Sequence, residues 1–544
     1  MKTTTRTLKR TITLRPPRQK KTNDVESKDL RVESSASTRV KVRMYRHGLG
    51  DCFLLTFPRP AGDRPFYMLI DCGVVLGTPD AAAIMMEVVE DIRSVTGDID
   101  VLVLTHEHWD HNSGFAQAKS AFAKIKVHQI WLAWTEDPGN QLARKLKAER
   151  RNALRALRAA ALRMRGVTAG SEAGVLSLLE FFGPVQGLSD PAMAAAGGTT
   201  EGAMKNAIDL ASNPPRYCHP VDPPIELEEL PGIRFYVLGP PENERRIKNL
   251  LPTKTGKETY DTALTLSPET AFLVAAVSDR PADGNPELND PDLQELARPF
   301  DKRWELGPDQ AKKDKFFVEK YFGEESWRKI DTDWLDAAGQ LALQLDSYTN
   351  NTSLVLAIEL TASGEVLLFA ADAQVGNWLS WNDQSWEVRD GERVRNVTAT
   401  DLLSRTMLYK VGHHGSHNAT LRAKGLELMQ SSALIALIPV DHNEAVKKRW
   451  NGMPFAALME RLDQKTSGRI LRNDDPEPPS RRQAPEGVPN TAWEDFLKNV
   501  TCQETTPGNY KVKYYEVSVK ELQPTCRAAE QPVQRRRGDS VSVA

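Results

Sequence analysis

The first 110 residues alternate between the apolar patterns of β-strands and of one helix. Short apolar runs bounded by turn residues predict strands at residues 40–45, 53–57, 66–70 and 99–104. Residues 81–95 instead repeat their apolar positions at helical spacing. This order of three strands, a helix and a strand, with polar groups at the strand ends, predicts an α/β fold whose site lies along one sheet edge.

The strand pattern returns later in the chain after two interruptions. Further strands are expected at residues 124–134, 233–238, 353–358, 366–370, 408–411, 433–440 and 510–517. The interruptions, at about 135–222 and 242–345, predict insertions, the first with a basic helix and the second helical and charged.

These patterns divide the chain into three parts. Residues 1–37 are polar and basic and are expected to form a disordered tail. Residues 38–445 hold most of the expected strands and are predicted to form the main domain. Residues 446–544 are predicted to form a small C-terminal extension, with a proline-rich linker at 474–489 and a basic tail.

Composition narrows the class of protein without identifying it. Of the 544 residues, 40% are hydrophobic and 26% are charged, which is typical of a globular protein. The formal net charge of −2 excludes a global attraction to nucleic acid, so any such attraction must be local. No apolar run approaches the roughly 20 residues that cross a bilayer. Five scattered cysteines without CxxC spacing favour a reducing compartment, and we expect a cytoplasmic protein without membrane association.

The most informative run follows the strand expected at 99–104. Its side chains His106, His108, Asp110 and His111 fall within six residues at the end of a buried strand. His106 and His108 are two positions apart and point to the same side of an extended backbone. Imidazole and carboxylate ligands suit zinc or a similar first-row ion. Because one ion needs three or four protein ligands, this run supplies half the ligands of two ions.

Two later motifs repeat the pattern of polar groups just past a buried strand. Asp372 follows the strand at 366–370, and His413 with His414 follows the strand at 408–411. Taken alone, Asp372 fits a helix N-cap and the histidine pair fits an ordinary loop. Together with the first run they supply a bridging carboxylate and another imidazole.

The ordered motifs now resemble a known superfamily. Asp71 in LIDCG, the HEHWDH run, Asp372 and HHGS at 413–416 resemble the motifs of the metallo-β-lactamase superfamily. More narrowly, GLGDCFLL, NNTSLVL, LLFAADA and LYKVGHHGS resemble the metallohydrolase domain of the DNA-uptake protein ComEC and its stand-alone soluble relatives. The resemblance covers roughly residues 40–115 and 345–440. It implies an αββα sandwich with helical insertions and a small C-terminal extension.

The resemblance also implies two divalent metal ions, zinc or manganese, and a role for each motif residue. The implied ligands are His106 and His108 on the first ion, Asp110, His111 and one of His413 and His414 on the second, with His414 preferred, and Asp372 bridging both. Asp71 is implied to hold the ligand loop by hydrogen bonds.

One expected ligand is missing. The superfamily usually has a histidine between the two halves of the site, but only His128 and His219 lie in this interval and neither has the right setting. The ComEC-like pattern puts Asn351 at this position. Since an amide oxygen is a weaker ligand than imidazole, we expect the first ion to be held less tightly, or manganese to be preferred.

Two adjacent metal ions can convert a water molecule into a reactive hydroxide. The implied pair of ions therefore predicts a metallohydrolase. We expect Asp110, Asp372 and Lys410 to be its catalytic side chains and a phosphodiester, most readily DNA, to be its substrate. Small phosphodiesters or other small esters are an alternative, since the fold hosts many chemistries. A second alternative is a partner-binding scaffold or sensor with a residual metal site.

The helix expected at 140–165 bears on the substrate. Its basic side chains share one face: Arg144, Lys147, Arg151, Arg155 and Arg158. This face predicts a contact surface for a phosphate backbone, with the solvated face of an ordinary helix as the alternative. A protein partner or a second copy of the chain could bind through the insertions.

Overall fold

The computed structural model describes residues 39–59, 64–164, 172–184, 198–249, 303, 306–321, 333–504 and 512–521. The strands are β1 (Arg39–Tyr45), β2 (Cys52–Phe57), β3 (Phe66–Cys72), β4 (Asp98–Leu104), β5 (Lys126–Ala133), β6 (Arg216–Cys218), β7 (Ile233–Gly239), β8 (Val355–Leu360), β9 (Glu365–Phe369), β10 (Ser385–Asp390), β11 (Arg393–Thr398), β12 (Thr406–Lys410), β13 (Ile435–Ile438), β14 (Ile470–Arg472), β15 (Val500–Glu504) and β16 (Val512–Glu521). The tail expected at residues 1–37 and the basic C-terminal tail lie outside the described residues.

The helices vary widely in length, from single turns to α5. They are α1 (Ala81–Val95), α2 (Trp109–Asn112), α3 (Gly114–Gln117), α4 (Lys119–Phe122), α5 (Gln141–Met164), α6 (Glu172–Leu179), α8 (Thr200–Leu210), α9 (Glu244–Ile247), α12 (Pro308–Ala311), α13 (Asp333–Asn350), α14 (Val375–Trp381), α15 (Ala399–Ser404), α16 (His442–Lys447), α17 (Ala456–Thr466) and α18 (Asn490–Lys498). Among the described residues, no helix is both long enough and apolar enough to cross a membrane.

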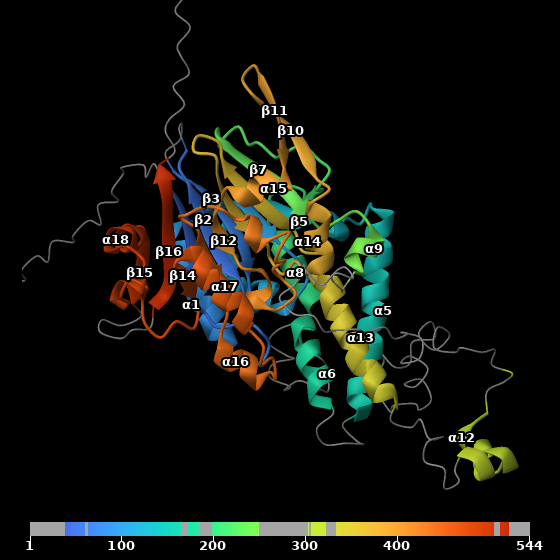
Figure 1. The fold of residues 1–544 in the computed structure, drawn as a ribbon. Helices are drawn as coiled ribbons and strands as arrows, with labels where there is room; N and C mark the ends of the chain where they lie inside the picture. The colour runs from blue at the N-terminus through green and yellow to red at the C-terminus, as the bar shows by residue number, and fades with distance from the viewer. Residues whose placement is uncertain are drawn as a thin grey trace, which may run out of the picture. The chain divides into compact units, whose positions relative to one another are not determined.

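Two mixed sheets form the centre of the fold (Figure 1). The first has eight strands in the order β15-β16-β1-β2-β3-β4-β5-β6, with β3 to β6 parallel. The second has six strands in the order β14-β13-β12-β9-β8-β7, with β9 and β12 to β14 parallel. In both sheets the carboxyl ends of parallel strands therefore share one edge, which is where functional side chains collect in such folds.

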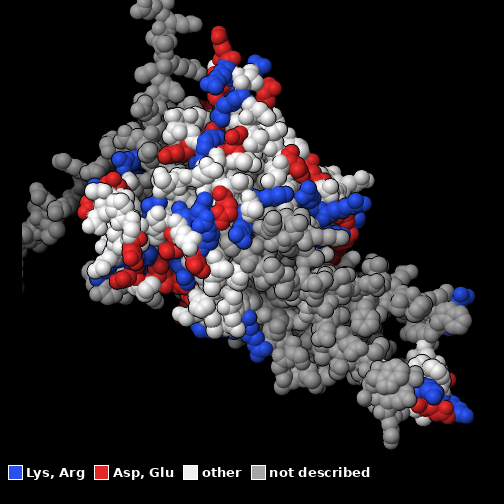
Figure 2. Space-filling model, in the orientation of Figure 1, with Lys and Arg blue, Asp and Glu red and all other residues white. Residues whose placement is uncertain are grey.

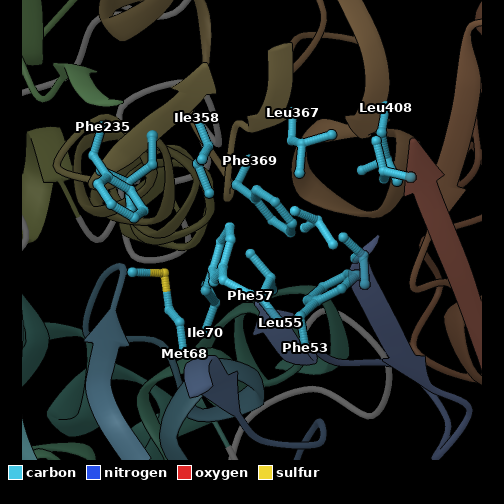
Figure 3. Packing of buried hydrophobic residues seen from close by; sticks show 14 of the residues in the cluster. Phe53, Leu55, Phe57, Met68, Ile70, Phe235, Ile358, Leu367, Phe369 and Leu408 are labelled. Carbon is cyan, nitrogen blue, oxygen red and sulfur yellow. The ribbon is translucent and has the colours of Figure 1, made fainter. Parts of the chain in front are cut away.

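The sheets pack face to face through their apolar side chains (Figure 3). Phe53 and Phe57 of β2 meet Phe369 of β9 and Phe235 of β7, with ring centroids 5.6 and 6.1 Å apart in edge-to-face geometry. All four rings are at most 2% exposed. Such buried aromatic pairs add to the burial of apolar area, which is the main force that holds two sheets together.

Helices cover the outer faces of both sheets. Helix α1 buries Met85, Val89 and Ile92 against the first sheet, with α3, α4 and α8 beside it. Helices α14, α15 and α17 cover the second sheet. The layers are therefore helix, sheet, sheet, helix, and the predicted αββα sandwich is confirmed.

A group of three longer helices stands beside the sandwich. Helices α5, α6 and α13 pack together through a separate apolar cluster that includes Leu157, Leu179 and Leu345 (Figure 1). The first two lie in the expected insertion at 135–222, and α13 leads from the expected insertion at 242–345 into β8. The predicted basic helix at 140–165 corresponds to α5.

The region expected to form a small C-terminal extension, residues 446–544, contributes strands to both sheets. Strand β14 is the last strand of the second sheet, and β16 pairs with β1 in the first, where Val42 lies opposite Val517. Within the proline-rich stretch at 474–489, Asp475 and Arg482 form an ion pair of 2.5 Å. The sandwich thus extends past the expected boundary.

Candidate metal centre

Polar side chains from both sheets meet where the parallel strands end. Asp71 lies near the end of β3, and Thr105 follows β4 in the first sheet. Asp372 follows β9, and Lys410 ends β12 in the second sheet. The backbone amide of Leu354 donates to the carbonyl of Thr105 at 2.8 Å, which ties the edges of the two sheets together.

Four of the predicted ligands form one tight group. One potential ligand atom from each of Asp110, His111, Asp372 and His414 lies within 4.8 Å of the others. Nε2 of His414 is 2.9 Å from Oδ2 of Asp110, and Nε2 of His111 is 3.1 Å from Oδ2 of Asp372. All four residues are 0% exposed.

Another group shares Asp372 with these four residues, which form the second group because they were expected on the second ion; the ligands expected on the first ion form the first group. His106, His108 and Asp372 bring their ligand atoms within the same 4.8 Å limit, and Nε2 of His106 lies 4.0 Å from Oδ2 of Asp372. The structure thus brings together the residues assigned to the two ions from the sequence, in the same division. Their occupation by metal stays a prediction.

The donor atoms of these groups fit metal ions better than they fit one another. They are buried and have no hydrogen-bond partner: Nε2 of His106, both ring nitrogens of His108, Oδ1 of Asp110, Nε2 of His111 and Oδ2 of Asp372. Buried polar atoms without a partner are costly and rare, so their concentration here indicates an absent partner. Imidazole nitrogens and carboxylate oxygens are the donors that zinc and manganese accept.

Other hydrogen bonds fix the orientation of two imidazoles. Nδ1 of His111 bonds to Oδ2 of Asp71 at 2.8 Å, and Nδ1 of His414 donates to the carbonyl of Pro439 at 2.9 Å. Asp71 also accepts from the backbone amide and the hydroxyl of Thr105. These bonds turn both Nε2 atoms toward the second group, as second-layer partners of metal ligands usually do. Asp71 therefore lies where the supporting role was expected.

The environment shifts the imidazole pKa values in two directions. Burial lowers the pKa of His108 to about 3 and that of His106 well below its usual value, so both rings are neutral. Burial also opposes protonation of His111, but the carboxylates of Asp372 and Asp51 outweigh it and raise its pKa well above its usual value.

The site also concentrates strained backbone. Asp71, Ala371, His413 and His414 have φ values of 54, 48, 42 and 52°, and they are four of the seven non-glycine residues with positive φ in the described chain. Such conformations cost on the order of 1–3 kcal/mol each and persist where surrounding contacts enforce them. Here they cluster at the carboxyl ends of β3, β9 and β12, where the ligand groups lie.

His413 and His414 take different roles although they are adjacent. His414 belongs to the four-residue group, as preferred from the sequence. Nδ1 of His413 bonds to the side-chain amide of Gln374 at 3.2 Å, and its unpaired Nε2 lies 3.9 Å from Oδ2 of Asp372. Burial lowers the pKa of His413 to about 4. Its ring is therefore neutral and stands beside both groups.

Lys410, expected to be a catalytic side chain, is enclosed by acceptors of the protein itself. Its ammonium group is 1% exposed and contacts Oδ2 of Asp51 at 2.6 Å, Oδ1 of Asp372 at 3.2 Å and the carbonyl of Ala371 at 2.8 Å. These three acceptors use its three donors. Lys410 positions Asp372 and leaves only Oδ2 of that carboxylate for the two groups. Asp51 was not singled out from the sequence, although it stands in the quoted GLGDCFLL motif.

Asn351, expected as a third ligand, is held by other parts of the fold. Its amide nitrogen donates to the carbonyls of Ile247 and Asn249, and its oxygen accepts from the backbone amide of Asn377 at 3.1 Å. The whole side-chain amide is thus used to join α9 and α14 to the start of β8. The amide is thus engaged in hydrogen bonds, and the expected role of Asn351 as a supporting residue or weak ligand stays a prediction.

An unpredicted carboxylate lies near this gap instead. Oδ1 of Asp346, on α13, is 3.9 Å from Nε2 of His108. Burial raises the pKa of Asp346 well above its usual value, and the charges of Asp372 and Asp110 add to this effect. The sequence signal was weak, because Asp346 belongs to a helix and not to a strand end.

The basic helix α5 presents fewer unpaired charges than its sequence implied. Lys147 forms a 3.2 Å ion pair with Glu136, and Arg158 donates to the carbonyl of Phe182 at 3.3 Å. Arg144 donates to the carbonyl of Pro138, while Arg151 is exposed and Arg155 half-buried. On the described surface visible in Figure 2, Lys and Arg are interspersed with Asp and Glu. Much of the predicted stripe therefore serves the fold.

The comparisons with known proteins agree with this geometry. Residues 52–190 match the family model described as metallo-beta-lactamase superfamily. The chain therefore contains a domain of this superfamily, whose members are mostly hydrolytic metalloenzymes. The matched segment includes His106, His108, Asp110 and His111, whereas Asp372 lies outside it. No curated protein matches the chain.

Proposed function

We propose that this protein is a two-metal phosphodiesterase that hydrolyses DNA. The observation that carries the proposal is the position of Oδ2 of Asp372, which lies 4.0 Å or less from imidazole nitrogens of both groups, His106 on one side and His111 and His414 on the other. A carboxylate oxygen shared by two sets of imidazole donors is the arrangement that holds two adjacent cations.

Bound divalent ions would supply Lewis acidity and lower the pKa of a water molecule, which is the chemistry that phosphodiester hydrolysis needs. The side chains of the protein do the positioning. Lys410 holds Oδ1 of Asp372 and so directs Oδ2 toward the ions. Nδ1 of His413 accepts from the Gln374 amide, so the neutral ring carries its proton on Nε2, from which it can donate a hydrogen bond to an oxygen of the substrate.

DNA as the substrate rests on two further points. The motifs resemble those of the ComEC metallohydrolase domain, and α5 carries the exposed side chains Arg144 and Arg151. Arginine side chains on a helix can contact successive phosphates and supply the sequence-independent part of DNA affinity.

The surroundings of His108 favour a second candidate, a hydrolase of small phosphodiesters or other small esters. Phe181 stacks on the His108 ring at 5.2 Å, and Phe182 meets the same ring edge-on at 4.9 Å. His413, at 4% exposed, is the most exposed of the predicted ligands. An enclosed site of this kind suits a narrow substrate, either a single strand or a small ester.

One experiment separates these candidates. Metal-loaded full-length protein is incubated with linear and circular single- and double-stranded DNA, with RNA and with bis-p-nitrophenyl phosphate. The control is the His108→Ala, Asp110→Ala double variant. Cleavage of DNA by the native protein and not by the double variant supports the proposal. Cleavage of the small ester alone selects the second candidate, and no hydrolysis by protein that holds its ions leaves a scaffold or sensor.

A further inference from the structure

The first group of ligands is one donor short. His106, His108 and Asp372 provide three donors, and one of them is shared with the second group. Asn351, the residue at the expected fourth position, uses its whole amide in hydrogen bonds with Ile247, Asn249 and Asn377. Both ring nitrogens of His108 nevertheless have no partner in this buried setting.

Asp346 lies beside this gap and has one unused oxygen. It belongs to the last turns of α13, and its side chain is more than nine-tenths buried. Oδ2 accepts from Nδ2 of Asn350, one helical turn further on, at 3.2 Å. Oδ1 has no hydrogen-bond partner and lies 3.9 Å from Nε2 of His108. A hydrogen bond therefore holds the carboxylate by Oδ2, and Oδ1 makes no hydrogen bond.

The distance between Nε2 of His108 and Oδ1 of Asp346 bears on whether both atoms can bind one ion. At 3.9 Å they are too far apart for a hydrogen bond. Two donors that each lie about 2.0–2.2 Å from one zinc ion are at most about 4.4 Å apart. The 3.9 Å between His108 and Asp346 therefore allows a common ion, as does the 4.0 Å between His106 and Asp372. The group whose atoms all lie within 4.8 Å of one another holds His106, His108 and Asp372 without Asp346, so this carboxylate would have to move toward the ion to bind it.

The negative charges of the buried carboxylates also favour bound cations. Five buried carboxylates surround the two groups: Asp51, Asp71, Asp110, Asp346 and Asp372. Among the described residues, Lys410 is the one buried lysine that contacts any of them. Two divalent ions and this lysine carry five positive charges, which would match the five carboxylates when all of them are ionised.

We infer that Asp346 is the missing ligand of the ion held by His106 and His108, so that α13 completes the metal centre. This inference rests on the proposed function, because it requires that the centre binds metal. It replaces a neutral amide by a carboxylate and so reverses the expectation of a weak first site. It also makes a helix packed against α5 and α6 part of the centre.

The direct test is metal binding by the full-length protein. Native protein, Asp346→Asn and the control Asp383→Asn are titrated calorimetrically with Zn²⁺ and, separately, with Mn²⁺, and bound metal is counted by mass spectrometry. Asp383 is an exposed carboxylate paired with Arg246, so its variant removes the same charge away from the centre. We expect Asp346→Asn to weaken one of two sites at least tenfold, the lower end of the loss seen for supporting residues of metal sites, with the other site and the control unchanged.

Thermal melting separates a ligand from a structural residue. Asn is isosteric with Asp and removes a buried charge, so ion-free Asp346→Asn should melt at or above the temperature of the ion-free native protein. Its melting temperature should then rise less on addition of metal than that of the native protein. Lower ion-free stability with an unchanged response to metal would indicate a structural role and overturn the inference.

The outcomes distinguish the inference from the proposed function. If native protein binds neither metal, the proposed function fails and the inference fails with it. If native protein binds two ions and Asp346→Asn binds them equally well, only the inference fails. If the variant loses one ion while no substrate is cleaved by either protein, Asp346 is a ligand and the proposed hydrolysis is wrong.

Discussion

Nε2 of His414 lies 2.9 Å from Oδ2 of Asp110, although the two residues are 304 positions apart in the sequence. Asp110 follows the end of β4 in the first sheet, and His414 follows β12 in the second. The candidate centre therefore joins the two sheets of the sandwich at one edge. Metal bound here would hold the sheets together as well as act on a substrate.

Removal of metal should therefore lower the stability of the whole sandwich. A ligand present at 100 times its Kd stabilises the folded state by about 2.7 kcal/mol for each site. We expect a chelator to lower the melting temperature in differential scanning calorimetry, and Zn²⁺ or Mn²⁺ to restore it. Equal melting temperatures with and without chelator would mean that the centre holds no ion in solution.

Substitution of the shared carboxylate should reduce the amount of bound metal more than substitution of one histidine. Oδ2 of Asp372 serves both groups, whereas His108 serves the first alone. We expect Asp372→Asn to lose most of both ions and His108→Gln to lose one, when bound metal is measured against protein after dialysis. Similar losses in the two variants would argue against a bridging carboxylate.

Metal affinity should rise with pH. The carboxylates of Asp372 and Asp51 raise the pKa of His111 above its usual value, so the ion-free protein holds a proton that the metal must displace. Below that pKa the affinity should increase by up to about tenfold per pH unit for each proton released, and above it the increase should stop. Calorimetry in buffers of different ionisation enthalpy counts the released protons, and a count of zero would contradict the assignment.

Substitution of Lys410 should lower the free energy of unfolding. Its removal leaves Asp51 and Asp372 without their buried cation, and breaking a buried pair in this way costs about 3–5 kcal/mol. We expect Lys410→Met to lower the free energy of unfolding in urea by this amount in the ion-free protein. Lys447→Met, which removes a side chain that is 64% exposed, is the control and should change little.

Two basic residues of α5 should respond differently to charge reversal. Lys147→Glu places a negative charge beside Glu136 and should lower stability, whereas Arg151→Glu changes an exposed residue and should alter the free energy of unfolding by no more than about 0.5 kcal/mol. If α5 contacts DNA, Arg151→Glu should also weaken DNA binding and reduce its salt dependence. Unchanged DNA affinity at low salt would assign this helix face to solvent.

The strands and the two ligand groups could be predicted because their signals are local. A buried strand that ends in several metal-binding side chains is visible in a short run of sequence, as at His106 and His108, and parallel strands bring such ends to one edge. The helix expected at 81–95 matches α1 in both bounds for a similar reason, because its apolar positions repeat at a helical period.

The surroundings of the first group could not be predicted in this way. The contact between Asp346 and His108 depends on how α13 packs beside the sandwich, which no pattern within α13 encodes. The amide of Asn351 is used by residues of α9 and α14, one of them 104 positions away. Likewise, the sequence shows Lys147 as one of a row of basic residues on a helix. Its ion pair with Glu136 becomes apparent only in the structure.

The pairing of β16 between β1 and β15 also bears on how the protein is made. A ribosome releases residues 39–45 long before residues 512–521, so β1 must wait with one edge unpaired while most of the chain is synthesised. Unpaired edges of this kind are templates for aggregation, and long-range pairing is slow. Synthesis in a cell-free system should therefore yield more folded protein with chaperones than without them, and the two halves of the metal centre should assemble late.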